Sequence, residues 1–454
     1  MTTRSVVSRL FRRLTPRASG RDPAVRDDRR AVSASGAGAA VEGRGAVSAA
    51  GTETAIADDD ERHAISAAET AAAKNVAEAA NRFAFDLHRA LGADGGNLVF
   101  SPASLSLGLA SILAAARGET AAQMARTLHV DGLDEALRHE GYRALLRRWT
   151  DPVRPDRVPR VAIRIFVERT VPLEPAFVDL ALADHGAPVE PIDLRGAPER
   201  ARAHIDEWVS ERTGGRIREI VPPGLIGSDT RFVLANAVCF EGRWLDPFDE
   251  HRTRDGPFHL ASGKTVSVPL MSRTHDAAYA EHDGVKALRL PCAGGALEMV
   301  FLLPAERGRL DRLERLLGAR GIDGWIGATR VTEVDMTIPR FKLERAQPFE
   351  LESTLSDLGM PLVFSSAADL TGMSAERPLS IGSLLHRARV DVDERGTEAS
   401  AATALFGSWG VAAAPPEFRA DHPFLFAIRD VASGMLLFVG RVADPSRPDR
   451  CPRP

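Results

Sequence analysis

Cysteine, aromatic side chains and long apolar runs are all scarce in this sequence. Its 454 residues include three cysteines, Cys239, Cys292 and Cys451, and only 6% aromatic residues. An odd number of widely spaced cysteines argues against a disulfide framework and against a C-x-x-C metal site. Cys239 lies in an apolar segment, so we interpret it as a small buried hydrophobic residue. No apolar run is long enough to cross a bilayer, and we therefore expect no membrane partner.

The sequence also lacks the motifs of the common catalytic and cofactor sites. Its 12 histidines form no H-E-x-x-H pair, and neither a G-x-x-x-x-G-K-[ST] phosphate loop nor a G-x-S-x-G nucleophile elbow is present. The net charge is −4, and the basic residues are nearly all arginine, which we attribute to genome composition rather than to phosphate binding. We therefore expect no metal, no cofactor, no enzyme activity and no nucleic-acid partner.

Residues 1–75 differ in composition from the rest of the chain. Phe11 is the only aromatic residue before Phe83, arginine dominates the first part, and alanine, glycine and serine dominate the next. Such a segment buries too little apolar surface to offset its ordering entropy, so we interpret it as a disordered extension, with a tether or a targeting arm as alternatives. No apolar stretch of useful length follows the basic start, so no signal peptide is predicted.

Helix and strand patterns begin near residue 76, and a composition with 44% hydrophobic residues allows a large core. Apolar residues at steps of three and four predict a helix over residues 76–91. Ser101 followed by Pro102 is typical of the start of the next helix. That second helix is apolar nearly all round, so we expect it to be buried.

The remaining patterns mix helices with strands. Further helices are expected from residue 118 and over residues 134–149, 201–213, 310–317 and 349–358. Strand patterns occur at residues 158–167, 232–240, 265–271, 287–290, 297–303, 331–338 and 386–393. The run at 232–240 is apolar throughout, as in a central strand that is buried on both faces. Because the elements do not alternate regularly, we predict the α+β class and not a doubly wound sheet.

The segment after the last of these strands has an unusual composition. In residues 386–393, His386 and three apolar residues alternate with charged ones, which predicts a strand with one buried face. Gly396 permits a turn, and alanine, threonine and serine then dominate residues 397–404. Side chains this small can leave solvent and enter a sheet without clashes.

Four stretches, taken in chain order, resemble motifs of the serpin family. They are NLVFSPAS at residues 97–104, NAVCFEGRW at 236–244, HRA at 386–388 with DERGTEA at 393–399, and DHPFLF at 421–426 with LFVGR at 437–441. Each stretch alone is weak evidence, but four stretches in the family's order over residues 76–445 make a strong resemblance. By composition, the chain is similar to a bacterial type of serpin.

The resemblance implies the serpin fold, with three β-sheets, about eight or nine helices and an exposed reactive-centre loop. It implies a serpin domain over residues 76–445, followed by a short tail at 446–454. It implies a reactive-loop hinge made of Glu394, Gly396, Thr397, Glu398, Ala399, Ser400, Ala401, Ala402 and Thr403. It also places four residues in the shutter, a hydrogen-bond cluster beneath the central sheet: Ser101, Ser104, Asn236 and His386.

The family's mechanism implies a function for this segment. In serpins a serine protease cleaves the exposed loop and forms an acyl-enzyme ester, and the freed hinge inserts into the central sheet. The resemblance therefore implies an inhibitor of serine-type endopeptidases, with the target protease as its covalent partner and the inhibitor a monomer. The buried face of the inserted strand would carry Thr397, Ala399, Ala401 and Thr403, and none of these is proline or charged.

The family spacing confines the cleaved bond to a short window. Counting forward from Glu394 places Gly410 on its N-terminal side, whereas counting back from Pro423 places Ala412 there, so the loop is longer than usual. The candidates are Trp409, Gly410, Val411, Ala412 and Ala413. None is Arg or Lys, which disfavours a trypsin-like target. Val411 or Ala412 would suit a small pocket, elastase-like or subtilisin-like, and Trp409 a chymotrypsin-like one; we favour the small pocket.

Two other functions stay open at this point. A non-inhibitory serpin, acting as a binding or chaperone-like protein, would have the same fold, although the hinge residues argue against it. An enzyme is disfavoured because the catalytic motifs are missing. The compartment is also open: the resemblance suggests an extracellular protein, but no signal peptide is predicted, so a cytoplasmic protein is the alternative.

Overall fold

The computed structural model describes residues 67–149, 159–241, 243–375, 379–395 and 414–447. Most of the expected N-terminal extension and most of the tail lie outside these ranges. So do the hinge from Gly396 onward and all five candidates for the cleaved bond, from Trp409 to Ala413.

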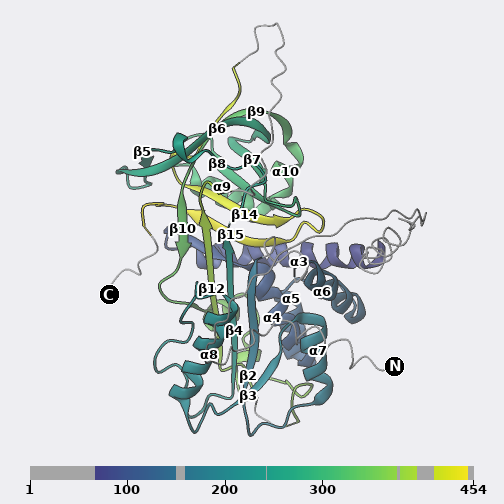
Figure 1. Ribbon diagram of the computed structural model, residues 1–454. Coiled ribbons are helices and arrows are strands. Elements are labelled where there is room, and N and C mark those ends of the chain that lie inside the picture. Colours follow the sequence, from purple (N-terminus) through teal and green to yellow (C-terminus); the bar gives the residue numbers. More distant parts are fainter. Residues whose placement is uncertain (1–66, 150–158, 242, 376–378, 396–413, 448–454) are drawn as a thin grey trace, which may run out of the picture. The chain divides into compact units, whose positions relative to one another are not determined.

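Six strands form the sheet that carries the expected central strand. Its order is β10–β12–β4–β2–β3, and β11 pairs with β12 beside β10. The bounds are β2 (Arg160–Glu168), β3 (Val189–Ile192), β4 (Phe232–Glu241), β10 (Phe341–Glu344), β11 (Phe349–Glu350) and β12 (Ser383–Val392). The two middle strands β4 and β12 run parallel, with residues 383–391 paired to 233–241. Figure 1 shows them side by side in the lower half of the view.

The other strands form a second sheet of nine strands. Its strands are β1 (Leu98–Phe100), β5 (Arg254–His259), β6 (Thr265–His282), β7 (Val285–Pro291), β8 (Leu297–Pro304), β9 (Arg330–Pro339), β13 (Glu417–Arg419), β14 (Phe424–Asp430) and β15 (Leu436–Val442). The long strand β6 pairs with β5 and β9 over its first part and with β7 at its end. It therefore joins two groups of strands, which with the six-stranded sheet agree with the three sheets expected for the fold.

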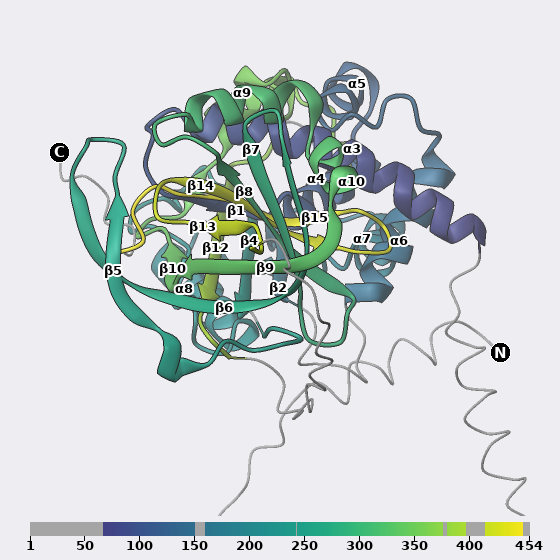
Figure 2. The ribbon, with the colours of Figure 1, turned by 90° about the horizontal axis from the view of Figure 1, so that it is seen from above.

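Nine α-helices occur in the described residues. They are α3 (Ala67–Leu91), α4 (Pro102–Ala115), α5 (Gly118–Thr127), α6 (Glu135–Trp149), α7 (Pro175–His185), α8 (Pro198–Arg212), α9 (Leu310–Arg320), α10 (Asp323–Ala328) and α11 (Glu352–Asp357). Seen from above in Figure 2, α3 and α9 lie on the side of β7 and β8 opposite to β5 and β6. Within these described ranges, none of the helices has both the length and the apolar character of a membrane span.

The strand β4 explains why the six-stranded sheet is buried on both faces. Val233, Ala235, Ala237 and Cys239 belong to the core cluster that contains residues of α8. The alternate residues, such as Phe232, belong to the main core with α4. Because successive side chains of a strand point to opposite faces, an apolar run of this kind fits only between two layers. The prediction of a central strand at residues 232–240 is therefore confirmed.

Several boundaries differ from the sequence predictions. The helix expected from residue 76 begins at Ala67, because Ala72 and Ala73 are buried as well and extend its apolar face. The segment expected as one helix over 349–358 starts instead as β11, since Phe349 pairs with His386 of β12, and only Glu352–Asp357 is helical. The strand expected at 265–271 continues to His282 as β6, because its second half finds partners in β9 and β7.

Candidate functional site

The parallel pair β4–β12 lies where the resemblance places the functional region. β12 ends at Val392, and the expected hinge begins at Glu394. A segment that leaves this end of β12 and turns back would run antiparallel to β12 and, because the two strands are parallel, antiparallel to β4 as well. Between β4 and β12, such a segment could therefore form antiparallel backbone pairing with both strands at once.

The four expected shutter residues form one buried network across this pair. Asn236 and His386 stand opposite each other in the β4–β12 register, and His386 Nδ1 lies 3.1 Å from Asn236 Oδ1. The Ser101 backbone N–H donates to His386 Nε2 at 3.0 Å, and Ser104 Oγ donates to Asn236 Oδ1 at 2.8 Å. Asn236 Nδ2 donates to the Ser104 carbonyl at 2.7 Å. The structure brings the four residues together, while their part in sheet opening stays a prediction.

The contacts fix the protonation of His386. Its Nε2 accepts from Ser101, so the proton lies on Nδ1, which donates to Asn236. Complete burial lowers the pKa of His386 to about 3, and the ring is therefore neutral near neutral pH. Phe349 of β11 stacks on the same ring, with centroids 6.4 Å apart and an angle of 14° between the planes.

The start of α4 places the two serines of this network. Ser101 is the N-cap of α4, its Oγ accepts from the Ser104 backbone N–H at 3.3 Å, and Pro102 occupies the first helical position, as the sequence predicts. Gly108 lets the helix lie close to β4, because a Cβ at this position would stand only 3.2 Å from Leu234 Cδ2. The helix α4 is therefore tied by hydrogen bonds to both strands of the central pair.

A second buried group anchors the end of β12. The Glu394 side chain is 3% exposed, accepts two hydrogen bonds from Arg340 at 2.6 and 3.1 Å and accepts one from Thr253 Oγ1 at 2.6 Å. Burial alone would raise the pKa of Glu394, but the hydrogen bonds from Arg340 and Thr253 outweigh it and hold the pKa below its usual value. Glu394 is therefore a buried, paired carboxylate.

The segment after β4 holds the backbone of this same stretch. Trp244 Nε1 donates to the Asp393 carbonyl at 2.7 Å, and its backbone N–H donates to the Arg395 carbonyl at 3.0 Å. The backbone N–H of Phe248 donates to the Glu394 carbonyl, also at 3.0 Å. The last described residues before Gly396 are thus bound to the segment that follows β4.

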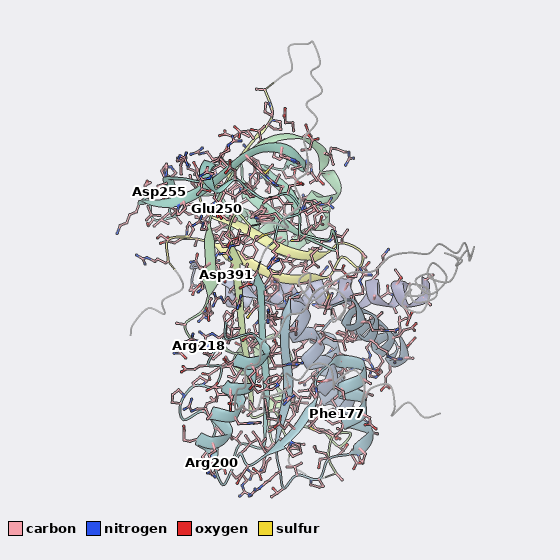
Figure 3. The ribbon with its side chains drawn as sticks, in the orientation of Figure 1. Phe177, Arg200, Arg218, Glu250, Asp255 and Asp391 are labelled. Carbon is pink, nitrogen blue, oxygen red and sulfur yellow. The ribbon has the colours of Figure 1, made fainter. Side chains whose placement is uncertain are left out.

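The opposite face of β12 is charged. Arg389 donates to the Arg216 carbonyl at 3.0 Å and pairs with Asp391 at 2.8 Å, and Arg387 donates to the Glu219 carbonyl. Arg216 and Glu219 belong to the connection between α8 and β4. In Figure 3, Arg218 of this connection lies beside the sheet, and Asp391 marks the end of β12 nearest to Glu250. The charged face predicted from the alternation in residues 386–393 is therefore covered by polar backbone.

Some of the anchoring residues were not predicted from the sequence. Trp244 lies inside a stretch that resembles the family, so its position carried a signal. Arg340 and Thr253 lie 54 and 141 residues from Glu394, in segments without a distinctive motif. No group of three or more His, Cys, Asp or Glu side chains suited to a metal ion occurs in the part of the chain that the structure describes.

Comparison with known proteins decides the family. The family model described as Serpin (serine protease inhibitor) matches residues 78–445. The chain belongs to the serpin family. Leukocyte elastase inhibitor from Bos taurus is 36% identical over 382 residues, which are 82% of this chain and 100% of that protein. An uncharacterized serpin-like protein of Thermococcus kodakarensis is 36% identical over 375 residues, 82% of this serpin and 86% of its own length.

The solved structures agree with this assignment. Uncleaved ovalbumin has a TM-score of 0.75 with this serpin at 29% identity, covering 82% of this chain and 100% of ovalbumin. The predicted family and the predicted α+β serpin fold are confirmed. Membership of this family also places the chain among protease inhibitors rather than enzymes, as the sequence predicts.

Proposed function

We propose that this serpin traps serine-type endopeptidases by a suicide-substrate mechanism in which the hinge inserts between β4 and β12. The observation that carries the proposal is the direct parallel pairing of these strands over residues 383–391 and 233–241, with the hinge at the end of β12. Family membership supports a protease as the partner. The proposal also includes a covalent complex with the protease, a monomeric inhibitor and the roles of the individual hinge and shutter residues.

Insertion would improve the backbone pairing of the sheet. One parallel ladder between β4 and β12 would be replaced by two antiparallel ladders, and antiparallel pairing is slightly more stable per residue. The pairing gained by the new strand would supply the free energy for the movement. The uncleaved loop is tethered at both ends, to β12 and to β13, so cleavage is the step that frees the hinge.

Insertion would also open the shutter. Neighbouring strands lie about 4.8 Å apart, so a strand placed between β4 and β12 moves them to about 9.6 Å. The hydrogen bond of 3.1 Å between His386 and Asn236 cannot survive this separation. We therefore assign the shutter residues Ser101, Ser104, Asn236 and His386 the role of holding the closed sheet until the hinge is released.

The hinge sequence permits this movement. Thr397, Ala399, Ala401 and Thr403 would face the core side of the sheet, and small uncharged side chains enter such a site without an electrostatic penalty. Neither proline nor a bulky charged residue interrupts this face. The hinge residues lie outside the described residues, so this step rests on their sequence and on the geometry of β12.

The chemistry begins at the target protease. Its serine Oγ attacks the carbonyl carbon of the cleaved bond, the C–N bond breaks, and the leaving amine takes a proton, so that an ester joins the protease to the N-terminal part of the loop. Insertion before hydrolysis of that ester would carry the protease away from the site of attack. Val411 and Ala412 suit a small S1 pocket, which agrees with the name of the leukocyte elastase inhibitors among the relatives.

A covalent-trapping assay tests the proposal. The purified protein is incubated with elastase-, subtilisin-, chymotrypsin- and trypsin-like proteases, and the products are separated on denaturing gels. We expect a band at the summed mass that survives boiling with the elastase-like or subtilisin-like enzyme, and mass spectrometry of the released peptide should locate the cleaved bond between Trp409 and the residue after Ala413. Cleavage in this window without such a band would contradict trapping and support the binding or chaperone-like function.

A further inference from the structure

A pocket lies between four helices. Its volume is about 830 Å³, and it is lined by α4, α5, α6 and the last residue of α7. Figure 1 shows the four helices grouped beside β2 and β4, and the label of Phe177 in Figure 3 marks α7. Pockets for small ligands measure about 300–1,000 Å³, so this one has room for a small organic molecule.

One wall of the pocket is apolar and built of small side chains. α5 contributes Ala121, Ala122 and Ala125, which lie on one side of the helix, and α4 contributes Ala110 and Leu113. Because these side chains are short, α5 leaves space where longer residues would fill the gap between the helices. This wall suits the hydrocarbon part of a ligand.

Another part of the lining is polar. α6 contributes Arg138, His139 and Tyr142, which lie at steps of one, three and four residues and therefore face the same side. Tyr142 is 1% exposed, and its hydroxyl is bonded to Ser106 Oγ at 2.7 Å. Within the described residues, Arg138 has no carboxylate partner, so its guanidinium is available to a ligand.

His185, the last residue of α7, is the most unusual group in the pocket. It is 1% exposed, and in the described part of the chain neither Nδ1 nor Nε2 has a hydrogen-bond partner. Its ring lies 5.3 Å from the ring of His139 and 5.3 Å from that of Tyr142. Burial lowers the pKa of His185 to about 3, so the neutral ring offers one donor and one acceptor. Buried polar groups are nearly always satisfied, and an unsatisfied imidazole beside a pocket indicates a missing partner.

The charged side chains that line the pocket indicate the charge of the missing ligand. Asp134 already caps α6 by accepting from the Leu137 backbone N–H at 2.7 Å, and Glu135 lies 3.6 Å from His139 Nε2. Of the carboxylates that line the pocket, Asp131 alone has no such contact within the described residues, and it is exposed. Two other arginines line the pocket, but Arg117 donates to the Ala114 and Ala116 carbonyls and Arg126 pairs with Glu119. Arg138 is therefore the charge best placed to meet a ligand group of opposite sign.

We propose that this pocket binds a small carboxylate with an apolar body. The hydrocarbon part lies against α4 and α5, and the carboxylate accepts hydrogen bonds from Arg138 and from the N–H of His185. None of the lining residues belongs to the hinge or to the shutter. The inference is therefore independent of the proposed inhibitory function, and either can fail without the other.

Calorimetric titration of the full chain with four probes tests the ligand chemistry. The probes are octanoate, the neutral octanamide, the oppositely charged octylammonium, and inorganic phosphate, which lacks the apolar part. We expect octanoate to bind with at least about tenfold higher affinity than the other three, which corresponds to about 1.4 kcal/mol. Equal binding of octanamide or octylammonium, preferential binding of phosphate, or no binding of octanoate at millimolar concentration would each overturn the proposal.

Two variants test the residues. Arg138→Gln should weaken octanoate binding at least about tenfold, whereas Arg82→Gln, at an exposed arginine of α3 outside the pocket, should leave it unchanged. His185→Leu should weaken octanoate binding and at the same time raise the thermal midpoint of the ligand-free protein, because it removes buried polar atoms without partners. A structural histidine would give the opposite thermal shift. A lowered midpoint with unchanged octanoate affinity in His185→Leu would contradict the assignment.

Discussion

At the residue scale, two polar side chains on β12 and just beyond its end, His386 and Glu394, are buried and hydrogen-bonded. Glu394 meets Arg340 and Thr253, and His386 meets Ser101 and Asn236. Groups of this kind add little free energy when they are paired, but each is costly when its partner is removed. We therefore expect them to favour the closed arrangement of β4 and β12 and to be positions at which single substitutions act strongly.

Replacement of Glu394 should loosen the end of β12. Glu394→Ala removes three hydrogen bonds and leaves Thr253 and Arg340 without their carboxylate, and we expect a loss of about 2–3 kcal/mol in the free energy of unfolding, since the half-exposed Arg340 can be rehydrated. Urea unfolding followed by tryptophan fluorescence measures the change. Glu350→Ala, at an exposed position of β11, is the control, and an equal effect of both substitutions would contradict the assignment.

Acidification should destabilise the protein before its carboxylates titrate. Burial lowers the pKa of His88 to about 4 and those of His185 and His386 to about 3, against about 6.5 in an unfolded chain. Between pH 6.5 and about 4.5 the unfolded state therefore binds more protons than the folded state, and stability is lost as the pH falls, by up to about 1.4 kcal/mol per pH unit for each histidine. A thermal midpoint that stays constant over this range would contradict these three values.

Residue roles were only partly accessible from the sequence. The alternation around His386 predicted its buried face, and the resemblance supplied Ser101 and Asn236 as neighbours. Arg340 and Thr253 carried no signal, because their contacts with Glu394 depend on how β10 and the segment before β5 pack around the end of β12. Contacts between distant segments are set by the tertiary structure, which local patterns do not encode.

At the element scale, β12 is the strand on which the proposed mechanism depends. Its alternation of apolar and charged residues places Ala388, Val390 and Val392 in the core and Arg387 and Arg389 under the connection from α8. The rest of the expected hinge follows the anchored residue Glu394 in the chain. The two faces of an inserted hinge strand would therefore meet different surroundings, and substitutions on them should have different effects.

A charge on the core face of the hinge should block insertion. Thr397→Arg should leave folding intact but convert the protein from inhibitor to substrate, because insertion would bury an unpaired guanidinium. Glu398 would lie on the other face of the hinge and is already charged in the parent protein. The control variant Glu398→Arg should therefore retain trapping. Gel quantification of complex and cleaved inhibitor separates the outcomes, and if Thr397→Arg traps the protease as well as the parent does, the insertion argument is wrong.

Element types were predicted better than element ends. The buried strand β4 and the buried helix α4 were evident from continuous apolar runs, because only an element with neighbours on all sides can be apolar all round. The strand β11 was not predicted, since two residues hold no period and it exists only through its pairing with β12. The second half of β6 was missed for the same reason, as its partners are far away in the sequence.

At the scale of the whole molecule, the account requires β4 and β12 to move apart. In the register of the β4–β12 pair, Arg389 stands directly opposite Cys239. A reversible cross-link between these two positions would prevent the strands from separating. Neighbouring strands lie about 4.8 Å apart, which is within the range of Cα separations that a disulfide spans. Arg389→Cys would therefore allow a disulfide between the two strands, and reduction would release it.

Protease trapping by the Arg389→Cys protein, oxidised and reduced, is the most direct test of strand separation. Burial raises the pKa of Cys239 to about 12, so the bond has to be formed by long incubation with an oxidant and verified by mass spectrometry. Arg389→Ser controls for the lost contacts to Arg216 and Asp391. We expect the oxidised protein to be cleaved without forming a covalent complex, and the reduced protein and the serine variant to form it. Equal trapping by the oxidised and reduced proteins would contradict insertion between β4 and β12.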